Sequence, residues 1–251
     1  MIRLLAIWSI LGLALTAPVA AQNPAEGDEG PSAADLHVAH RLDQLAQVAM
    51  SGQSEPDRAQ FTQAYILLNH AVALDPTDAQ RWLFLAEAAE ALGDEDRVVE
   101  CLKQYLRLEP ENDVAQLRLI DIIAARQQTA EERLAFFLRM VEGRAARQFS
   151  PALRSRVALK AAMFQAEQGQ PEEYARLLSL ALNLDPTNKQ AAAESYRVLI
   201  GSPSAQLREK AAALFTLLQA EPTDPATHAE VAEMHLALGL YPRATGWYQS
   251  A

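Results

Sequence analysis

Histidine and aspartate side chains near the start of the chain have a spacing that could hold a metal ion. His37, His40 and Asp43 recur at steps of three, which would place three ligands on one face of a helix. A metal site also needs supporting residues that orient its ligands, and no second segment supplies them beside this run. We therefore interpret the three residues as ordinary helix side chains, with metal binding as the alternative.

Two further groups of reactive side chains lack the partners that catalysis needs. His228 and His235 lie near Glu230 and Glu233, but they do not form the His-Glu-x-x-His arrangement of zinc proteases. Cys101 is the only cysteine, and no base is indicated that would activate it as a nucleophile. The chain also has no glycine-rich phosphate loop and no Gly-x-Ser-x-Gly elbow. We predict no enzyme, no metal and no cofactor, and we assign these residues to packing.

The best candidate for a binding site is a basic segment. Between positions 126 and 156, seven arginines stand against three glutamates, a local balance of +4. Guanidinium groups suit carboxylates and phosphates, so we predict that this segment docks an acidic segment of a partner or of this chain. The alternative is pairing with acidic neighbours such as Asp94, Glu95 and Asp96. The arginines are Arg126, Arg133, Arg139, Arg144, Arg147, Arg154 and Arg156.

Helices must position these side chains, and a recurring proline indicates where the helices repeat. The prolines are separated by 34, 76 and 36 residues, and Ser150-Pro151 divides the long interval into 41 and 35. A period near 34 with two helical segments per unit is typical of stacked helical hairpins. The motif appears as Asp75-Pro76, Glu109-Pro110, Asp185-Pro186 and Glu221-Pro222.

Residues 79–110 show the repeat most clearly. Asp78 is placed to cap a first helix, Gly93 to end it, and Pro110 to close a second helix. One face of each helix is apolar, with Trp82, Leu85, Ala86 and Ala89 in the first and Val98, Leu102 and Tyr105 in the second. This unit resembles a tetratricopeptide repeat. Its departures from the family pattern are a small Ala89, a large Val98 and Tyr105, and Leu102 in place of an aromatic residue.

The resemblance extends over residues 33–251 and implies the fold. We expect an all-α solenoid of stacked antiparallel helix hairpins, with about twelve helices in a right-handed superhelix. The unit 113–151 is long, and Thr129 with Glu132 makes a capping box that fixes where its extra helix begins. The predicted units are 33–76, 79–110, 113–151, 154–186, 189–222 and 225–251.

The start of the chain has the pattern of an export signal. Residues 1–21 combine Arg3, an apolar run and small residues before Gln22, which predicts a signal peptide, with an uncleaved anchor as the alternative. Residues 22–32 are predicted to be a flexible acidic linker. The formal charge is −10, which argues against nucleic-acid binding, and a single cysteine allows no internal disulfide. We expect a periplasmic or cell-envelope location and no membrane span after signal cleavage.

In the family, the first helices of the hairpins line a concave surface, and some members hold a carboxylate clamp of lysine and asparagine there. The equivalent positions here do not carry the clamp's residues, so the clamp is absent. By alignment of the repeats they are Leu83 and Glu87, Leu117 and Asp121, Ala158 and Ala162, Ala193 and Arg197, and Ala229 and Glu233. This surface suits an apolar helix or an extended peptide better than a free carboxy terminus.

Two further expectations concern function and the end of the chain. Trp247 and Tyr248 should lie on an uncovered stacking face, which predicts a continuation or docking at that end. We predict a non-catalytic protein–protein interaction scaffold of the cell envelope that binds partner segments on its concave surface. The alternative is the N-terminal repeat domain of a larger envelope enzyme or assembly factor whose active part lies beyond Ala251.

Overall fold

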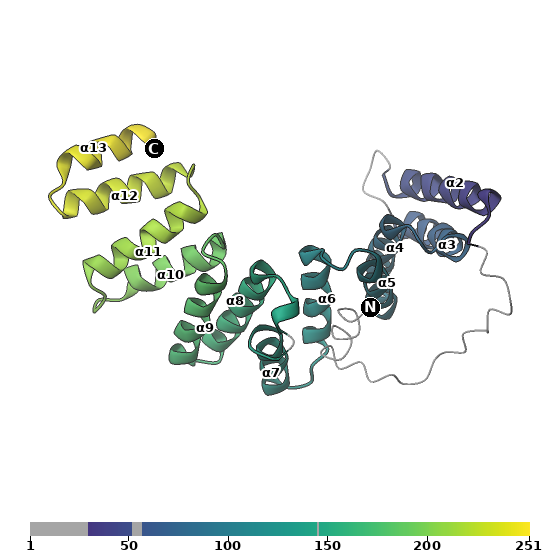
Figure 1. Cartoon of the computed structure of the whole chain (residues 1–251), viewed down its shortest axis with the longest axis horizontal. Coiled ribbons are helices and arrows are strands. Elements are labelled where there is room, and N and C mark those ends of the chain that lie inside the picture. Colours follow the sequence, from purple (N-terminus) through teal and green to yellow (C-terminus); the bar gives the residue numbers. More distant parts are fainter. Residues whose placement is uncertain (1–29, 52–56, 145) are drawn as a thin grey trace. The chain divides into compact units, whose positions relative to one another are not determined.

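The computed structural model describes residues 30–51, 57–144 and 146–251 (Figure 1). These residues form twelve α-helices and one short 3-10 helix, and no strand occurs among them. The predicted all-α fold of helical hairpins is confirmed. The predicted signal peptide and most of the predicted linker lie outside the described residues.

The chain divides into two compact units, with the boundary between Gln127 and Gln128. The boundary falls inside the predicted unit 113–151. In the first unit α2 packs on α3, α3 on α4, α4 on α5 and α5 on α6. Its helices are α2 (Ala33–Met50), α3 (Arg58–Leu74), α4 (Ala79–Leu92), α5 (Glu95–Leu108) and α6 (Asp113–Ala125).

The second unit is built in the same way, because each of its α-helices packs on the next one along the chain. This nearest-neighbour packing is what a stack of helical hairpins requires. Its helices are α7 (Ala130–Val141), the 3-10 helix η1 (Ala146–Gln148), α8 (Pro151–Glu167), α9 (Pro171–Leu184), α10 (Lys189–Gly201), α11 (Leu207–Ala220), α12 (Pro225–Ala237) and α13 (Tyr241–Ser250).

The recurring acid–proline motif is a side-chain-stabilised turn. The Asp75 carboxylate accepts hydrogen bonds from the Thr77 backbone N–H (3.0 Å) and from the Thr77 hydroxyl (2.6 Å). Asp185 and Thr187 repeat the same two bonds, at 2.9 and 2.6 Å. The aspartate therefore orders the turn while the proline prevents the preceding helix from continuing.

Local signals also fix where helices begin and end. Thr129 and Glu132 form the predicted capping box at the start of α7. Gly93 follows α4 with a φ of 80°, a left-handed conformation that a residue with a Cβ adopts only with strain. These two observations agree with the sequence interpretation.

The predicted placement of Trp247 on an uncovered face is wrong, while docking at this end of the chain stays a prediction. The Trp247 ring is partly buried against the core cluster that contains Leu214 and Val231, and it packs on the rings of His228 and His235. Trp247 therefore faces inward between α12 and α13 instead of lying on an uncovered face. Tyr248 is exposed, as expected.

Candidate functional site

Asp43 lies in a buried ion network. The Arg81 Nε group donates to both Asp43 carboxylate oxygens, at 2.9 and 2.8 Å, and Arg81 Nη1 lies 2.9 Å from Asp75 Oδ2. His37 and His40 are exposed on the same helix. In the described part of the chain no group of histidine, cysteine and acidic residues is arranged to hold a metal.

The network joins α2 to α4 through a buried ion pair between Asp43 and Arg81. Burial raises the pKa of Asp43 above its ordinary value, although the hydrogen bond and charge of Arg81 oppose this. Burial also acts to raise the pKa of Asp75, but hydrogen bonds from Thr77 and Arg81 outweigh it and leave that pKa lowered. We therefore assign the network to fold stability.

The other reactive side chains identified from the sequence are also packed. Cys101 is fully buried, and burial raises the pKa of its thiol to about 12, so it stays protonated at neutral pH. His235 is buried, and its Nδ1 lies 2.8 Å from the Val231 carbonyl oxygen. His228 lies between the carbonyl oxygens of Pro222 and Ser250, at 2.8 and 2.9 Å.

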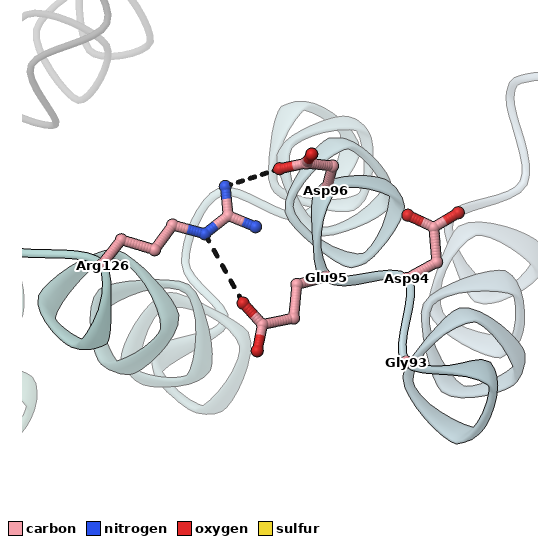
Figure 2. A pocket seen from close by; sticks show the side chains of 5 residues that line it. All are labelled: Gly93, Asp94, Glu95, Asp96 and Arg126. Carbon is pink, nitrogen blue, oxygen red and sulfur yellow. Dashed lines mark ion pairs between the residues drawn. The ribbon is translucent and has the colours of Figure 1, made fainter.

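The predicted arginine segment divides between the two units. Arg126 belongs to the first unit, where its guanidinium lies 2.8 Å from Asp96 and 3.8 Å from Glu95. Figure 2 shows this guanidinium directed at both carboxylates, beside a hollow of about 510 Å³ that Gly93 and Asp94 also line. Pairing with acidic neighbours, the alternative given by the sequence, therefore holds for Arg126.

The remaining arginines lie in the second unit and have different surroundings. The Arg133 guanidinium lies over the Phe164 ring, 5.8 Å from its centre. Arg154 donates from Nε (3.2 Å) and Nη2 (2.9 Å) to the carbonyl oxygen of Val141. The side chains that are exposed are those of Arg139, Arg144, Arg147 and Arg156.

In the first unit, the predicted inner-face residues come from α4 and α6. Leu83 and Leu117 are half-buried and Glu87 is exposed. Asp121 is half-buried on α6. An ion pair of 2.5 Å between Arg118 and Glu90 joins the two helices.

In the second unit, the first helices of the last two hairpins border a hollow of about 410 Å³. Two residues at predicted inner-face positions, Ala193 and Arg197 on α10, line it. On α12 the lining includes Ala226 and Glu230, one turn before the positions expected from the repeat alignment, Ala229 and Glu233. The rest of the lining consists of Tyr196, Ile200, Leu217, Glu221, Asp224 and Thr227.

The basic groups in and around this hollow are already paired. Arg197 donates to Glu194 from Nε (2.8 Å) and Nη2 (2.5 Å), and this bond raises the pKa of Arg197 and lowers that of Glu194. Lys189 forms an ion pair of 2.7 Å with Glu221. Each of these two ion pairs is therefore neutral overall.

Two carboxylates in the hollow have no basic partner. Asp224 Oδ2 accepts from the Thr227 backbone N–H (2.9 Å) and hydroxyl (2.6 Å), and these bonds lower its pKa. Glu230 accepts a hydrogen bond from the Tyr196 phenol, whose pKa is raised by burial and by this bond. Within the described ranges, neither Asp224 nor Glu230 forms an ion pair with lysine or arginine. The hollow therefore combines apolar walls from Ile200 and Leu217 with an excess of negative charge.

The best-defined repeat of the chain matches a known protein family. Residues 79–122, from the start of α4 into α6, match the tetratricopeptide repeat. The chain therefore carries a tetratricopeptide repeat there, which confirms the resemblance predicted from the sequence. No curated protein sequence matches the chain.

Several solved structures resemble the chain at low identity. PilW, a widely conserved type IV pilus biogenesis factor, is 21% identical, with 84% of this chain and 90% of that chain covered and a TM-score of 0.41. The pilF protein of Pseudomonas aeruginosa is 14% identical, with 85% and 90% covered and a TM-score of 0.46. YrrB, a TPR protein with an unusual peptide-binding site, is 12% identical, with 73% and 89% covered and a TM-score of 0.35. Similarity at this level carries no functional conclusion for this chain.

Proposed function

We propose that this protein is a non-catalytic scaffold that binds segments of partner proteins on the first helices of its hairpins. Stacked helical hairpins present extended surfaces on which partner segments bury apolar area. The observation that supports the proposal most is the hollow bordered by α10, α11 and α12. In the first unit we assign the same role to the surface that carries Leu83, Glu87, Leu117 and Asp121.

The chemistry of the hollow defines the partner segment that fits it. Ile200 and Leu217 offer apolar contact, while Asp224 and Glu230 offer carboxylates that no lysine or arginine of the described residues neutralises. A positively charged side chain of the partner would form ion pairs with these carboxylates, and an adjacent apolar residue would pack against Ile200 and Leu217. We therefore expect a segment in which lysine or arginine stands next to apolar residues.

A photoreactive residue placed in the hollow tests this function in the cells that make the protein. We expect benzoylphenylalanine at Ala193 to crosslink a small set of proteins through basic, apolar segments. Changing Glu230 to lysine in the same chain should reduce these products about tenfold, because one attraction becomes a repulsion. The products are identified by mass spectrometry of the crosslinked peptides.

Two matched controls make the crosslinking result specific. The same photoreactive residue at Gln219, which is exposed on α11 and outside the hollow, should not yield these products. Glu167 is exposed at the end of α8, and its change to lysine alters the net charge equally but should leave the products intact. Identical products from positions 193 and 219 would refute binding at the hollow.

We further propose that the scaffold works in the cell envelope. The support is the signal-like pattern of residues 1–21. Separately, no helix in the described ranges is long and apolar enough to cross a membrane. The protein isolated from cells should begin at Gln22, as measured by mass spectrometry of its N-terminal peptide. An N-terminal peptide that still contains residues 1–21 would contradict cleavage at this site.

A further inference from the structure

The connection between α7 and α8 is a tightly built turn. Gly143 donates its backbone N–H to the Arg139 carbonyl oxygen at 3.2 Å, and a Cβ on Gly143 would lie 2.3 Å from that same oxygen. Two non-bonded atoms cannot approach so closely, so only glycine fits here without a shift of the backbone. The path of the chain after α7 is therefore fixed by a backbone contact.

Buried anchors hold the rest of the turn in place. Ala146 and Phe149 are almost completely buried, at 1% and 6% exposure. Arg154 donates two hydrogen bonds to the Val141 carbonyl oxygen, which places a cation at the carboxyl end of α7. Glycine, buried side chains and a capping guanidinium together leave little freedom to the backbone of this turn.

The turn presents arginine side chains to solvent. Arg144 and Arg147 are exposed on the turn itself, and Arg139 is exposed on the last turn of α7. The Arg139 guanidinium also lies over the Phe136 ring, 5.9 Å from its centre, which restricts its position. We call Arg139, Arg144 and Arg147 the arginine turn.

The arginine turn is not neutralised by nearby acids. The nearest carboxylate in the sequence, Glu142, is bound to Arg176 at 2.7 Å. Among the ion pairs of the residues that the structure describes, none involves a member of the arginine turn. Arg81, Arg118, Arg126 and Arg197 do pair with carboxylates in this acidic protein. Arg139, Arg144 and Arg147 form no such pair with a described residue and lie within nine positions of one another, so their positive charges are concentrated on one turn.

We propose that the arginine turn is a second docking surface, which binds an acidic segment of a partner protein. Guanidinium groups bind carboxylates through paired, charge-assisted hydrogen bonds. The three arginines come from a helix end, a turn and a 3-10 helix, so they suit carboxylates spaced along a chain better than one small anion. The net charge of −10 disfavours the broad anionic surface of a membrane or a nucleic acid.

This surface is separate from the hollow of the proposed function and attracts the opposite charge. Arg126 and Arg133 of the predicted basic site are left out of it. Arg126 is paired with acids of its own unit, and the Arg133 guanidinium lies over Phe164. The two surfaces can therefore be tested independently.

Fluorescence anisotropy with a labelled glutamate–serine peptide tests the proposal on the full chain. We expect the natural sequence to bind this peptide more tightly than a lysine–serine peptide of equal length. Changing Arg144 and Arg147 together to glutamate should weaken binding of the acidic peptide by at least about tenfold. Binding should also weaken as the salt concentration rises from about 50 to about 300 mM.

A charge-matched variant separates the site from the net charge. Arg208 and Arg243 are exposed in the same unit, and changing both to glutamate alters the total charge equally. This variant should weaken binding by less than about twofold, because it leaves the arginine turn intact. Equal weakening by the two double variants would overturn the proposal, as would a natural sequence that does not bind the acidic peptide.

Two further measurements distinguish related explanations. Changing Arg144 and Arg147 to lysine keeps the charge but removes the guanidinium forks, so affinity should fall between those of the natural sequence and the glutamate variant. Helical content by circular dichroism should be the same in all variants. If inorganic phosphate at millimolar concentration displaces the peptide completely, the turn is a small-anion site and the proposal of a protein segment is wrong.

Discussion

Changing Arg81 to methionine will destabilise the first unit by about 3–5 kcal/mol. Arg81 is only 4% exposed and contacts the buried carboxylates of Asp43 and Asp75. Methionine fills much of the same space but leaves both carboxylates without their cation. Hydrogen exchange should show the loss as reduced protection of the amides in α2 and α4.

The pH dependence of this variant gives a second, independent signature. Without Arg81, burial should raise the pKa of Asp43 further above its unfolded value, because the hydrogen bond and charge that oppose burial are gone. A carboxylate with a raised pKa binds more protons in the folded state, so lowering the pH favours folding. The difference in unfolding free energy between the variant and the natural sequence should therefore shrink as the pH falls from about 7 to about 4.5, near the ordinary range of carboxylate pKa values.

A surface ion pair of the same unit provides the control. Arg118 pairs with Glu90 at 2.5 Å, but the Glu90 side chain is 63% exposed. Changing Arg118 to methionine should lower the unfolding free energy of this unit by no more than about 1 kcal/mol, because water screens exposed ion pairs. Equal losses for the Arg81 and Arg118 variants would show that the buried network does not hold α2 on α4.

Changing Phe136 to alanine will destabilise the second unit by about 3–5 kcal/mol. Phe136, on α7, is the largest fully buried side chain among the described residues, with 1% exposure. Its removal deletes apolar contacts and leaves a cavity that neighbouring helices fill only in part. Urea unfolding followed by hydrogen exchange of the α7 and α8 amides measures the effect.

Phe215 allows the same deletion at a partly exposed site. It lies on α11 with 43% exposure and meets His235 edge to face at 6.2 Å. Changing Phe215 to alanine should cost about 1 kcal/mol. If the two phenylalanine variants lose the same stability, the core of this unit is not centred where the structure places it.

The features predicted well from the sequence are those set by neighbouring residues. The capping box of Thr129 and Glu132, the turn at Gly93 and the Asp75-Pro76-Thr77 motif each act within a few positions. The apolar stripe through Trp82 and Leu85 also depends only on helical periodicity, and both residues are buried. The fold could therefore be derived from local patterns repeated along the chain.

The features that were missed depend on residues far apart in sequence. Asp43 belonged to a local histidine–aspartate pattern, but its partner is Arg81, 38 residues further on. Trp247 was assigned to an uncovered face because periodicity shows which residues share a face and not which neighbour covers it. In the structure His228 and His235 contact its ring.

The candidate site was only partly predictable for the same reason. Ala193 and Arg197 were identified on α10, whereas the lining of α12 lies one turn earlier than the repeat alignment suggested. Which residues of α12 face the hollow depends on how α12 packs on α11, and the sequence of one helix alone does not determine this. The arginine segment looked continuous in the sequence, but the unit boundary separates Arg126 from the rest.

Crosslinking from position 193, with and without the change of Glu230 to lysine, tests the scaffold function most directly. We expect products whose crosslinked peptides carry lysine or arginine beside apolar residues, and we expect these products to be lost when Glu230 is changed to lysine. We also expect that the reversal of Glu167 changes nothing. Products that persist unchanged after the Glu230 reversal, or that form equally from position 219, would contradict the proposed scaffold function.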